Sequence, residues 1–477
     1  MDYETVIGLE VHLQLKTKTK AFCGCSTEFG QEPNSQVCPV CLGFPGSLPV
    51  FNKVALDYAI KAALALNCKI QDYTKFDRKN YFYPDLPKAY QISQYDLPLS
   101  RNGHVDIEMA GNLKRIGITR VHMEEDAGKL IHQQENSLVD YNRTGIPLLE
   151  IVSEPDIRSP EEAYEYLTSL KSIIAYLDVS DCDMEKGSLR CDANISLKVK
   201  SAAEFGTKTE LKNMNSFKAV KDALNFEIKR QTELLDNGAK ITQETRLWDE
   251  KLQKTFSMRT KEGAQDYRYF PEPDLPPFVI ALEKIEEVRK TIPELPHEKM
   301  LRFMKVYGLA TGDSANLVSL RNIASYAEDC LKRYQPKEKK IIANWIIGPL
   351  FSEANSRNCG IWDLKVSSER LIELIGYVER EEISNLSAKA VLTEMIDSGK
   401  PASQIIKEKN LIQISDSVSL EAVISEAIKE NSKSVADYKA GKINAIMALV
   451  GQVMKKSAGK ANPKVVQELL KRRLDNA

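Results

Sequence analysis

The sequence predicts an α+β fold in which a large mixed domain precedes a purely helical region. Within roughly the first 290 residues, stretches of alternating apolar and polar residues are separated by segments with helical periodicity. From His297 onward only helical periods are visible. The change follows a proline-dense segment, residues 270–277, and then Pro293 and Pro296, which favour extended structure and end regular elements.

The strands and helices of the mixed region follow from local patterns. In residues 6–15 the apolar positions alternate with polar ones, as in a half-buried strand. The same alternation predicts strands at residues 113–123, 146–152 and 189–199. Ser159-Pro160-Glu161-Glu162 is a capping box that opens a helix towards Tyr176. Further helices are predicted at residues 52–67 and at residues 216–237, where Gly238 ends the helix.

The positions of proline and glycine residues between the predicted elements indicate three domains. A boundary near residue 293 separates residues 1–293 from a helical domain at 294–405. A second boundary, near Gly399-Lys400-Pro401, leaves a helical tail domain at 406–477. The length of 477 residues agrees with two to four domains at roughly 150 residues each.

Composition excludes several classes of protein. The chain is 43% apolar and 28% charged, which rules out a collagen, a mostly disordered chain and a membrane channel. No apolar run reaches the ~18 residues of a membrane span, and the N-terminus is acidic where a signal peptide would be basic. We therefore expect a cytoplasmic protein without membrane partners, in which the nine cysteines are thiols or metal ligands.

The strongest local motif is a pair of closely spaced cysteine pairs, Cys23-Gly-Cys25 and Cys38-Pro-Val-Cys41. This spacing is typical of a Cys₄ zinc site, in which four thiolates close the coordination tetrahedron and leave no open position for catalysis. We therefore predict a structural Zn²⁺ ion bound by Cys23, Cys25, Cys38 and Cys41; the alternative is four unrelated free thiols.

A second set of residues places carboxylates on predicted strands. Glu10 and His12 share one face of the first strand, and Glu150 interrupts an apolar strand. Glu124 and Glu125 end the strand that carries Arg120 and His122, while Arg190, Asp192 and Asn194 share a face of another strand. Acids on several strands could build an oxygen-rich pocket for Mg²⁺. A solvated sheet face with ordinary ion pairs is an equally good interpretation of the pattern alone.

Two further segments are candidates for contact with nucleic acid. Residues 76–90 mix aromatic and charged residues, which can stack bases, although tyrosines packing on prolines explain the pattern better. Residues 431–477 contain ten Lys/Arg and three Asp/Glu, a local charge of +7, so the remaining residues carry −8 of the net −1. A helix ending in Lys455 and Lys456, with Lys460 after a glycine, suits an RNA backbone. The alternative is a solvated helical face.

Some motifs are missing from the sequence. It contains no Walker A loop, no Rossmann G-x-G-x-x-G after a strand, and no kinase glycine loop. A bound nucleotide would therefore be held by metal and dispersed side chains. It also lacks G-x-S-x-G and a Ser/Lys-rich amidase loop, so we do not expect this chain to hydrolyse an amide itself.

The segments described above resemble those of a known family, the B subunits of aspartyl/glutamyl-tRNA amidotransferases. The resemblance spans the whole chain and is carried by long motifs. These motifs lie at residues 4–12, 76–85, 122–129, 187–194, 210–216, 266–274 and 437–463.

The resemblance implies a cradle domain on a largely antiparallel sheet, similar to glutamine synthetase, followed by the two helical domains. It also implies that the chain activates the side-chain carboxylate of Glu-tRNA(Gln) or Asp-tRNA(Asn) with ATP and Mg²⁺. Ammonia would then form Gln-tRNA or Asn-tRNA. An amidase A subunit would supply the ammonia, and a small C subunit would complete a heterotrimer.

The resemblance also assigns residues by position. Glu10, His12, Glu125 and Glu150 would hold the metal, and Arg190, Asp192, Asn194, Glu210 and Lys212 would line the nucleotide and carboxylate site. Lys79 and Lys88 would lie where the ammonia tunnel enters. Strand alternation instead puts Glu124, not Glu125, on the face of Arg120 and His122, so a ligand at Glu125 requires a bulge near Met123.

The alternative function is a non-catalytic RNA-binding assembly subunit with a decayed active site. Such a protein would be expected to have lost Glu10, His12 or Glu150, and all three are present. The sequence does not distinguish between the two misacylated tRNAs as substrates.

Overall fold

The computed structural model describes residues 2–109, 111–260, 267–336, 338–413, 417–457 and 461–475. The chain forms two compact units, Met1–Pro296 and His297–Ala477. The predicted boundary at residue 293 lies next to this division. The boundary at residue 405 does not divide the second unit, so the three-domain scheme remains a prediction.

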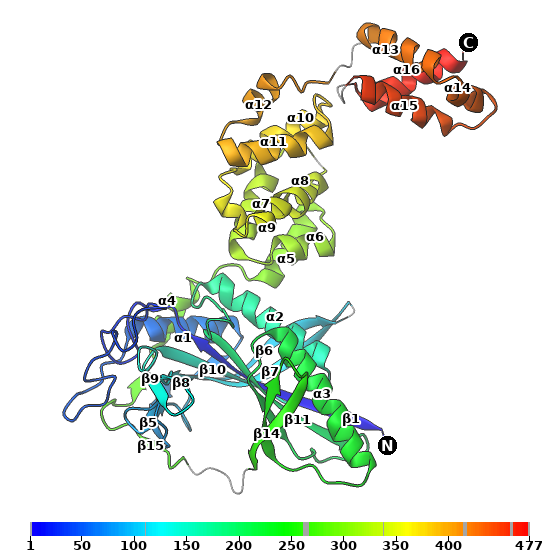
Figure 1. Ribbon diagram of the computed structural model, residues 1–477. Coiled ribbons are helices and arrows are strands. Elements are labelled where there is room, and N and C mark those ends of the chain that lie inside the picture. Colours follow the sequence, from blue (N-terminus) through cyan, green and yellow to red (C-terminus); the bar gives the residue numbers. More distant parts are fainter. Residues whose placement is uncertain are drawn as a thin grey trace. The chain divides into compact units, whose positions relative to one another are not determined.

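The first unit is built on a nine-stranded sheet with the strand order β14-β13-β12-β11-β1-β10-β7-β6-β2. Figure 1 labels β1, β6, β7, β10, β11 and β14 of this sheet. Neighbouring strands are antiparallel except β12 and β13, which are parallel. The strands are β1 (Tyr3–Gln14), β2 (Lys69–Ile70), β6 (Ser100–Met109), β7 (Asn112–Glu125), β10 (Pro147–Ser153), β11 (Leu189–Val199), β12 (Thr209–Lys212), β13 (Glu244–Asp249) and β14 (Lys254–Thr260). The predicted α+β class is confirmed, and so are the four strands expected from alternation.

Three small sheets accompany the large one. Strand β4 (Asp77–Asn80) lies between β5 (Tyr90–Ser93) and β15 (Phe270–Pro271). This arrangement brings the aromatic segment at residues 76–90 beside the proline-dense segment. The other two are the pair β3 (Tyr73–Thr74) with β16 (Phe278–Val279) and the hairpin β8 (Lys129–His132) with β9 (Ser137–Asp140).

The predicted helices of the first unit form, and each has a capped N-terminus. They are α1 (Lys53–Ala65), α2 (Pro160–Leu177) and α3 (Phe217–Asp236), and α4 (Leu282–Arg289) follows near the end of the unit. Asn52, Ser159 and Ser216 each accept a hydrogen bond from a backbone N–H in the first helical turn. Only half of the predicted capping box forms, because the Glu162 carboxylate accepts from the backbone N–H of Arg158 instead of that of Ser159.

Strand alternation divides the sheet into two chemically different faces. On β1, Ile7, Leu9 and Val11 are at most 1% exposed and join one apolar core with residues of α1, α2 and α3. Glu10 and His12 point to the opposite face, as their positions between these residues require. The helices therefore bury one face of the sheet and leave the other to polar side chains.

The second unit is helical, as predicted. Its helices are α5 (Pro296–Tyr307), α6 (Thr311–Leu317), α7 (Arg321–Arg333), α8 (Lys340–Trp345), α9 (Phe351–Ser356), α10 (Ser368–Glu379), α11 (Asn385–Ser398), α12 (Ala402–Glu408), α13 (Ser417–Glu430), α14 (Ser432–Lys439), α15 (Ala445–Lys456) and α16 (Pro463–Asp475). A π-helical stretch (Ile346–Leu350) follows α8, and a 3₁₀ turn (Ile361–Asp363) precedes α10. Residues of α13, α15 and α16 enclose an apolar core of their own.

The described helices include none that is both long enough and apolar enough to cross a lipid bilayer.

Candidate functional site

The polar face of the sheet brings together a histidine and two carboxylates from three adjacent strands. His12 on β1 pairs with Glu150 on β10, which pairs with His122 on β7. The Nε2 atom of His12 lies 3.6 Å from a Glu150 carboxylate oxygen and 3.8 Å from one of Glu124. One ligand atom from each of His12, Glu124 and Glu150 lies within 4.8 Å of the others, so the three could hold one metal ion. Two carboxylates and an imidazole suit a divalent cation.

A second histidine, His122, completes this cluster. Its Nε2 atom lies 3.3 Å from Glu150 and 3.8 Å from Glu124, and the residue is only 3% exposed. Burial would lower the pKa of His122, but the negative charges of Glu150 and Glu124 outweigh burial and raise it to about 9. Burial would likewise raise the pKa of Glu150, yet His122 and His12 lower it well below its usual value. The cluster therefore holds Glu150 as a carboxylate.

Glu125, which the resemblance assigned to the metal, lies away from His12 and Glu150. One carboxylate oxygen accepts from the backbone N–H of Ile92 at 2.9 Å, and Lys88 Nζ lies 2.8 Å from the carboxylate. The bulge that would turn Glu125 towards the polar face is not at Met123: the register of β7 and β10 is regular from Glu125 to Arg120 and shifts only beyond Val152. Strand alternation therefore groups Glu124 with the histidines.

Next to this cluster, Glu10 lies in a second group of charges. Its carboxylate accepts a hydrogen bond from Asn194 Nδ2 at 2.9 Å, and Glu10 is paired with Asp192 across β1 and β11. Lys212 on β12 contacts both Asp192 and Glu210. Burial, followed by the charges of Glu150, Asp192 and Glu210, raises the pKa of Glu10. A cation near Glu10 would relieve this repulsion.

Arg190 lies on the polar face of β11, two residues before Asp192, and pairs with a carboxylate outside this group. Its guanidinium donates to Asp126 at 3.0 Å, and Gln14 donates to the same carboxylate at 2.6 Å. Of the five residues that the resemblance assigned to the nucleotide and carboxylate site, four are neighbours, namely Asp192, Asn194, Glu210 and Lys212. Arg190 is instead engaged by Asp126.

A pocket opens beside Glu10 on the same face, with a volume of about 290 Å³. Gly8 and Asn194, which are paired across β1 and β11, contribute to its wall, together with Pro155, Phe205 and Lys208. Gly8 leaves room here because no side chain rises from its position on the strand. Sequence reasoning missed this pocket. The signal was Gly8 itself, a glycine on the polar face of an otherwise regular strand.

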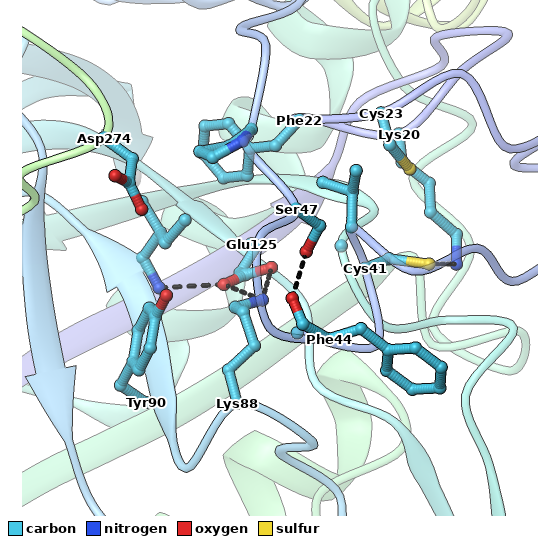
Figure 2. A pocket seen from close by; sticks show the side chains of 15 residues that line it. Lys20, Phe22, Cys23, Cys41, Phe44, Ser47, Lys88, Tyr90, Glu125 and Asp274 are labelled. Carbon is cyan, nitrogen blue, oxygen red and sulfur yellow. Dashed lines mark hydrogen bonds and ion pairs between the residues drawn. The ribbon is translucent and has the colours of Figure 1, made fainter.

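A second cavity, of about 190 Å³, encloses Lys88 and Glu125 (Figure 2). Figure 2 shows the Lys88 ammonium beside the Glu125 carboxylate, with Cys41 and Lys20 nearby. Lys79, the other residue assigned to the tunnel, does not line this cavity. Its ammonium lies 4.9 Å from the ring centre of Tyr267 and 5.9 Å from that of Tyr81. The two lysines thus occupy different surroundings.

The four cysteines of the predicted zinc site come together. One sulfur from each of Cys23, Cys25, Cys38 and Cys41 lies within 4.8 Å of the others, and the Cys38 and Cys41 sulfurs are 3.9 Å apart. Tetrahedral bonds of about 2.3 Å to zinc would separate sulfurs by about 3.8 Å, so the donor set fits Zn²⁺. Cys41 also accepts from the backbone N–H of Cys38 at 3.2 Å. Lys20, which is fully buried, places its ammonium 3.7 Å from the Cys41 sulfur.

Two of the three lysines proposed for RNA contact, Lys455 and Lys456, end helix α15 (Ala445–Lys456). Lys456 forms ion pairs with Glu426 and Glu430 of α13. Lys455 is exposed, and no ion pair involves it within the described residues. Lys460 lies outside the described residues. Of the two described lysines, Lys455 is therefore the one available to a phosphate.

Comparison with known proteins finds two family matches. Residues 5–286 match the GatB/GatE catalytic domain, and residues 325–474 match the GatB domain. The polar face of the sheet lies within the first match.

Similar curated proteins cover the whole chain. A protein of Carboxydothermus hydrogenoformans is 57% identical over 478 residues, with 99% of each chain covered. A protein of Caldicellulosiruptor saccharolyticus is 55% identical over 481 residues with 100% of each covered, and one of Brevibacillus brevis is 53% identical with 99% of each covered. All three are named as the B subunit of an aspartyl/glutamyl-tRNA(Asn/Gln) amidotransferase.

Proposed function

Because this chain belongs to the family of B subunits of aspartyl/glutamyl-tRNA(Asn/Gln) amidotransferases, we propose that it activates the side-chain carboxylate of a misacylated tRNA with ATP. Ammonia then converts the activated group to an amide, giving Gln-tRNA(Gln) from Glu-tRNA(Gln) or Asn-tRNA(Asn) from Asp-tRNA(Asn). The chain is thus the B subunit of a tRNA-dependent amidotransferase. The observation that carries the proposal is the carboxylate–histidine cluster on the polar face of the sheet.

We assign the metal to His12, Glu124 and Glu150, with Glu10 beside them. A bound Mg²⁺ would neutralise charge on the phosphates of the nucleotide. The residues of the chain do the positioning: His122 lies 3.3 Å from Glu150 and holds that carboxylate from the side opposite His12. Glu125, which is close to Lys88, is assigned to the neighbouring cavity instead.

We assign the nucleotide base to the pocket between Pro155 and Phe205. Proline and phenylalanine offer apolar surfaces to a planar base, and Gly8 lets the base approach the sheet. From there the phosphates would extend over β1 and β11 towards Glu10 and Lys212. The Lys212 ammonium, held between Asp192 and Glu210, is placed to meet a phosphate oxygen.

We propose that ammonia enters through the cavity that contains Lys88 and Glu125. The Cys₄ group forms part of its wall through Cys23 and Cys41, so a structural Zn²⁺ would hold this wall in shape. Lys79, between Tyr81 and Tyr267, is assigned to the passage from that cavity to the active face.

We assign the remaining parts of the reaction to partners. The relatives are named as B subunits, which supports a multi-subunit complex. We propose an amidase A subunit as the source of ammonia, and a small C subunit as the third member of a heterotrimer. The cytoplasm is the proposed location, since none of the nine cysteines forms a disulfide. The +7 segment at residues 431–477 would contact the tRNA backbone.

The first prediction concerns the activation step. In the reconstituted complex, Glu150→Gln reduces ATP-dependent conversion of Glu-tRNA(Gln) by about 100-fold or more, since it removes the charge that the cation and both histidines share. Labelled tRNA measures the conversion, and filter binding shows unchanged tRNA affinity. Glu161→Gln, which alters an exposed partner of Lys221, is the control and keeps full activity. Full activity of Glu150→Gln would sink the metal assignment.

The second prediction separates the two adjacent glutamates. Electron paramagnetic resonance titration with Mn²⁺, used as a probe for Mg²⁺, shows weaker binding by about tenfold or more in Glu124→Gln. Glu125→Gln binds Mn²⁺ as the unaltered protein does, because that carboxylate lies beside Lys88 and Ile92. The opposite ranking of the two variants would return the metal to Glu125.

The third prediction concerns the cysteines. Elemental analysis of protein purified without chelators finds one zinc ion per chain, and Cys38→Ser loses it because three thiolates bind far more weakly than four. Cys359→Ser, in the second unit and outside the cluster, retains the ion. Absence of zinc from the unaltered protein would refute the site.

The fourth prediction concerns the tail. Removing residues 406–477 weakens tRNA binding and flattens its dependence on salt, because basic residues that release counterions are lost. In the full chain, Lys455→Gln lowers the slope of log K against log salt by about 1, and Lys456→Gln changes it less because Glu426 and Glu430 already pair with that lysine. Equal slopes in the full and shortened chains would contradict this assignment.

A further inference from the structure

Arg120 is a charged residue on the polar face of the sheet, and the proposed function gives it no role. It lies on β7 opposite Val152 of β10, and Val152 in turn lies opposite Glu10 of β1. Directly paired residues of antiparallel strands point to the same side of a sheet. Arg120 and Glu10 therefore share the polar face, with their Cα atoms about 10 Å apart across two strand spacings.

Among the residues that the structure describes, no hydrogen bond or ion pair engages the guanidinium of Arg120. Its Nε atom is buried and makes no hydrogen bond, and within the described residues no carboxylate forms an ion pair with it. Other partly buried arginines of this unit are engaged, among them Arg78 by Glu272, Arg190 by Asp126 and Arg246 by Glu227. A buried N–H without an acceptor is unfavourable and rare. The Nε–H group of Arg120 is therefore an unsatisfied donor that an oxygen acceptor would stabilise.

Arg120 lies next to the cluster of His12, His122, Glu124 and Glu150. In the next row of the sheet lie Glu150 and His122, which face the same side. Tyr269 lies close to the carboxylates of the cluster and to Arg120. Its ring stacks on that of Tyr95, with ring centres 4.2 Å apart. Burial and then the charges of Glu124 and Glu150 raise the pKa of Tyr269, whereas Arg120 acts in the opposite direction. The phenol is therefore near enough to sense both the carboxylates and the guanidinium.

The position of Arg120 relative to the proposed nucleotide pocket indicates which anion it meets. That pocket lies over β1 and β11, at Gly8 and Asn194. Arg120 lies two strands away from β1, on β7. Phosphoryl transfer brings the attacking oxygen in line from the side opposite the leaving group. The β7 side of the face is therefore where the acceptor would enter.

We propose that Arg120 binds the side-chain carboxylate of the aminoacyl group on the tRNA and holds it for attack on the nucleotide. This inference rests on the proposed function. A guanidinium offers two parallel N–H groups that match the two oxygens of a carboxylate, which a lysine cannot reproduce. Val152, an apolar side chain on the same face, separates Arg120 from Glu10, so the acceptor and the acid are kept apart.

The proposed reaction has two steps, phosphoryl transfer to the carboxylate and then attack by ammonia. One carboxylate oxygen forms a bond to the γ-phosphorus of ATP, and the bond from that phosphorus to the β–γ bridging oxygen breaks. ADP leaves with the electron pair, and the other carboxylate oxygen becomes the carbonyl oxygen of an acyl phosphate. Ammonia then forms a bond to the carbonyl carbon, phosphate departs, and the surplus proton of the nitrogen passes to solvent. Arg120 stays charged and hydrogen-bonded to the carbonyl oxygen throughout.

The test uses the reconstituted complex with Glu-tRNA(Gln). Arg120→Gln lowers kcat/KM for the misacylated tRNA by about 100-fold, the usual effect of losing one charged donor at a reacting oxygen. Arg120→Lys loses less, since it keeps the charge but not the fork. The affinity for ATP alone, measured by equilibrium dialysis, is unchanged in both variants. Methylguanidinium added to Arg120→Ala restores part of the activity, which a purely structural defect would not allow.

A matched control variant tests whether these effects are specific to Arg120. Arg115→Gln, on the same strand but exposed and paired with Asp106, leaves all these values unchanged. Weaker ATP binding in Arg120→Gln, with an unaltered KM for the tRNA, would overturn the assignment and place the guanidinium on the nucleotide. Unchanged kcat/KM would also overturn it, and so would the absence of any rescue. If the unaltered complex forms no ADP with misacylated tRNA, the proposed function fails instead.

Discussion

The regular register of four antiparallel strands, β11, β1, β10 and β7, is the constraint on which the polar face depends. Each residue in this register has its partner on the same side, so Arg190, His12, Glu150 and His122 form one row and Asp192, Glu10, Val152 and Arg120 form the next. A slip of one residue in any pair would turn the histidines and carboxylates into the apolar core. The helices α1, α2 and α3 oppose such a slip, because they bury Ile7, Leu9 and Val11 on the other side. The same apolar packing that folds the sheet thereby aligns the cluster.

The sequence predicted the parts of this site that depend on alternation, because alternation is a local property. It identified β1, β7, β10 and β11 and the face that Glu10 and His12 share, and the structure adds Glu150 to that face. Alternation also placed Glu124 on the face of the histidines, where the structure has it, although the resemblance assigned the metal to Glu125. The sequence could not reveal that Lys88 and β5 engage Glu125, since that contact joins segments without a shared pattern. Nor could it show that Asp126 engages Arg190 while Arg120 has no ion-pair partner among the described residues, because alternation gives the face of a side chain but not its neighbours.

The four cysteines illustrate another limit of sequence reasoning. Their spacing predicted a common site, and the sulfurs do meet. The spacing did not indicate that Cys23 and Cys41 would line the cavity of Lys88 and Glu125, or that a fully buried Lys20 would approach Cys41. A buried ammonium requires negative or polar partners. A Cys₄ group that carries net negative charge with zinc bound would provide one, and this links the zinc loop to the cavity through charge as well as shape.

The charges on the active face limit how the proposed reaction can proceed. Glu10, Glu124, Glu150, Asp192 and Glu210 lie close together, and both proposed substrates, ATP and a carboxylate, are anions. Without further positive charge these carboxylates would repel both substrates. Lys212 is already shared by Asp192 and Glu210, and His12 and His122 by Glu124 and Glu150. A divalent cation at the cluster would draw the phosphates to the carboxylates, and the guanidinium of Arg120, which pairs with no carboxylate in the described part of the chain, would receive the acceptor. The two anions would then approach each other because each meets its own positive charge.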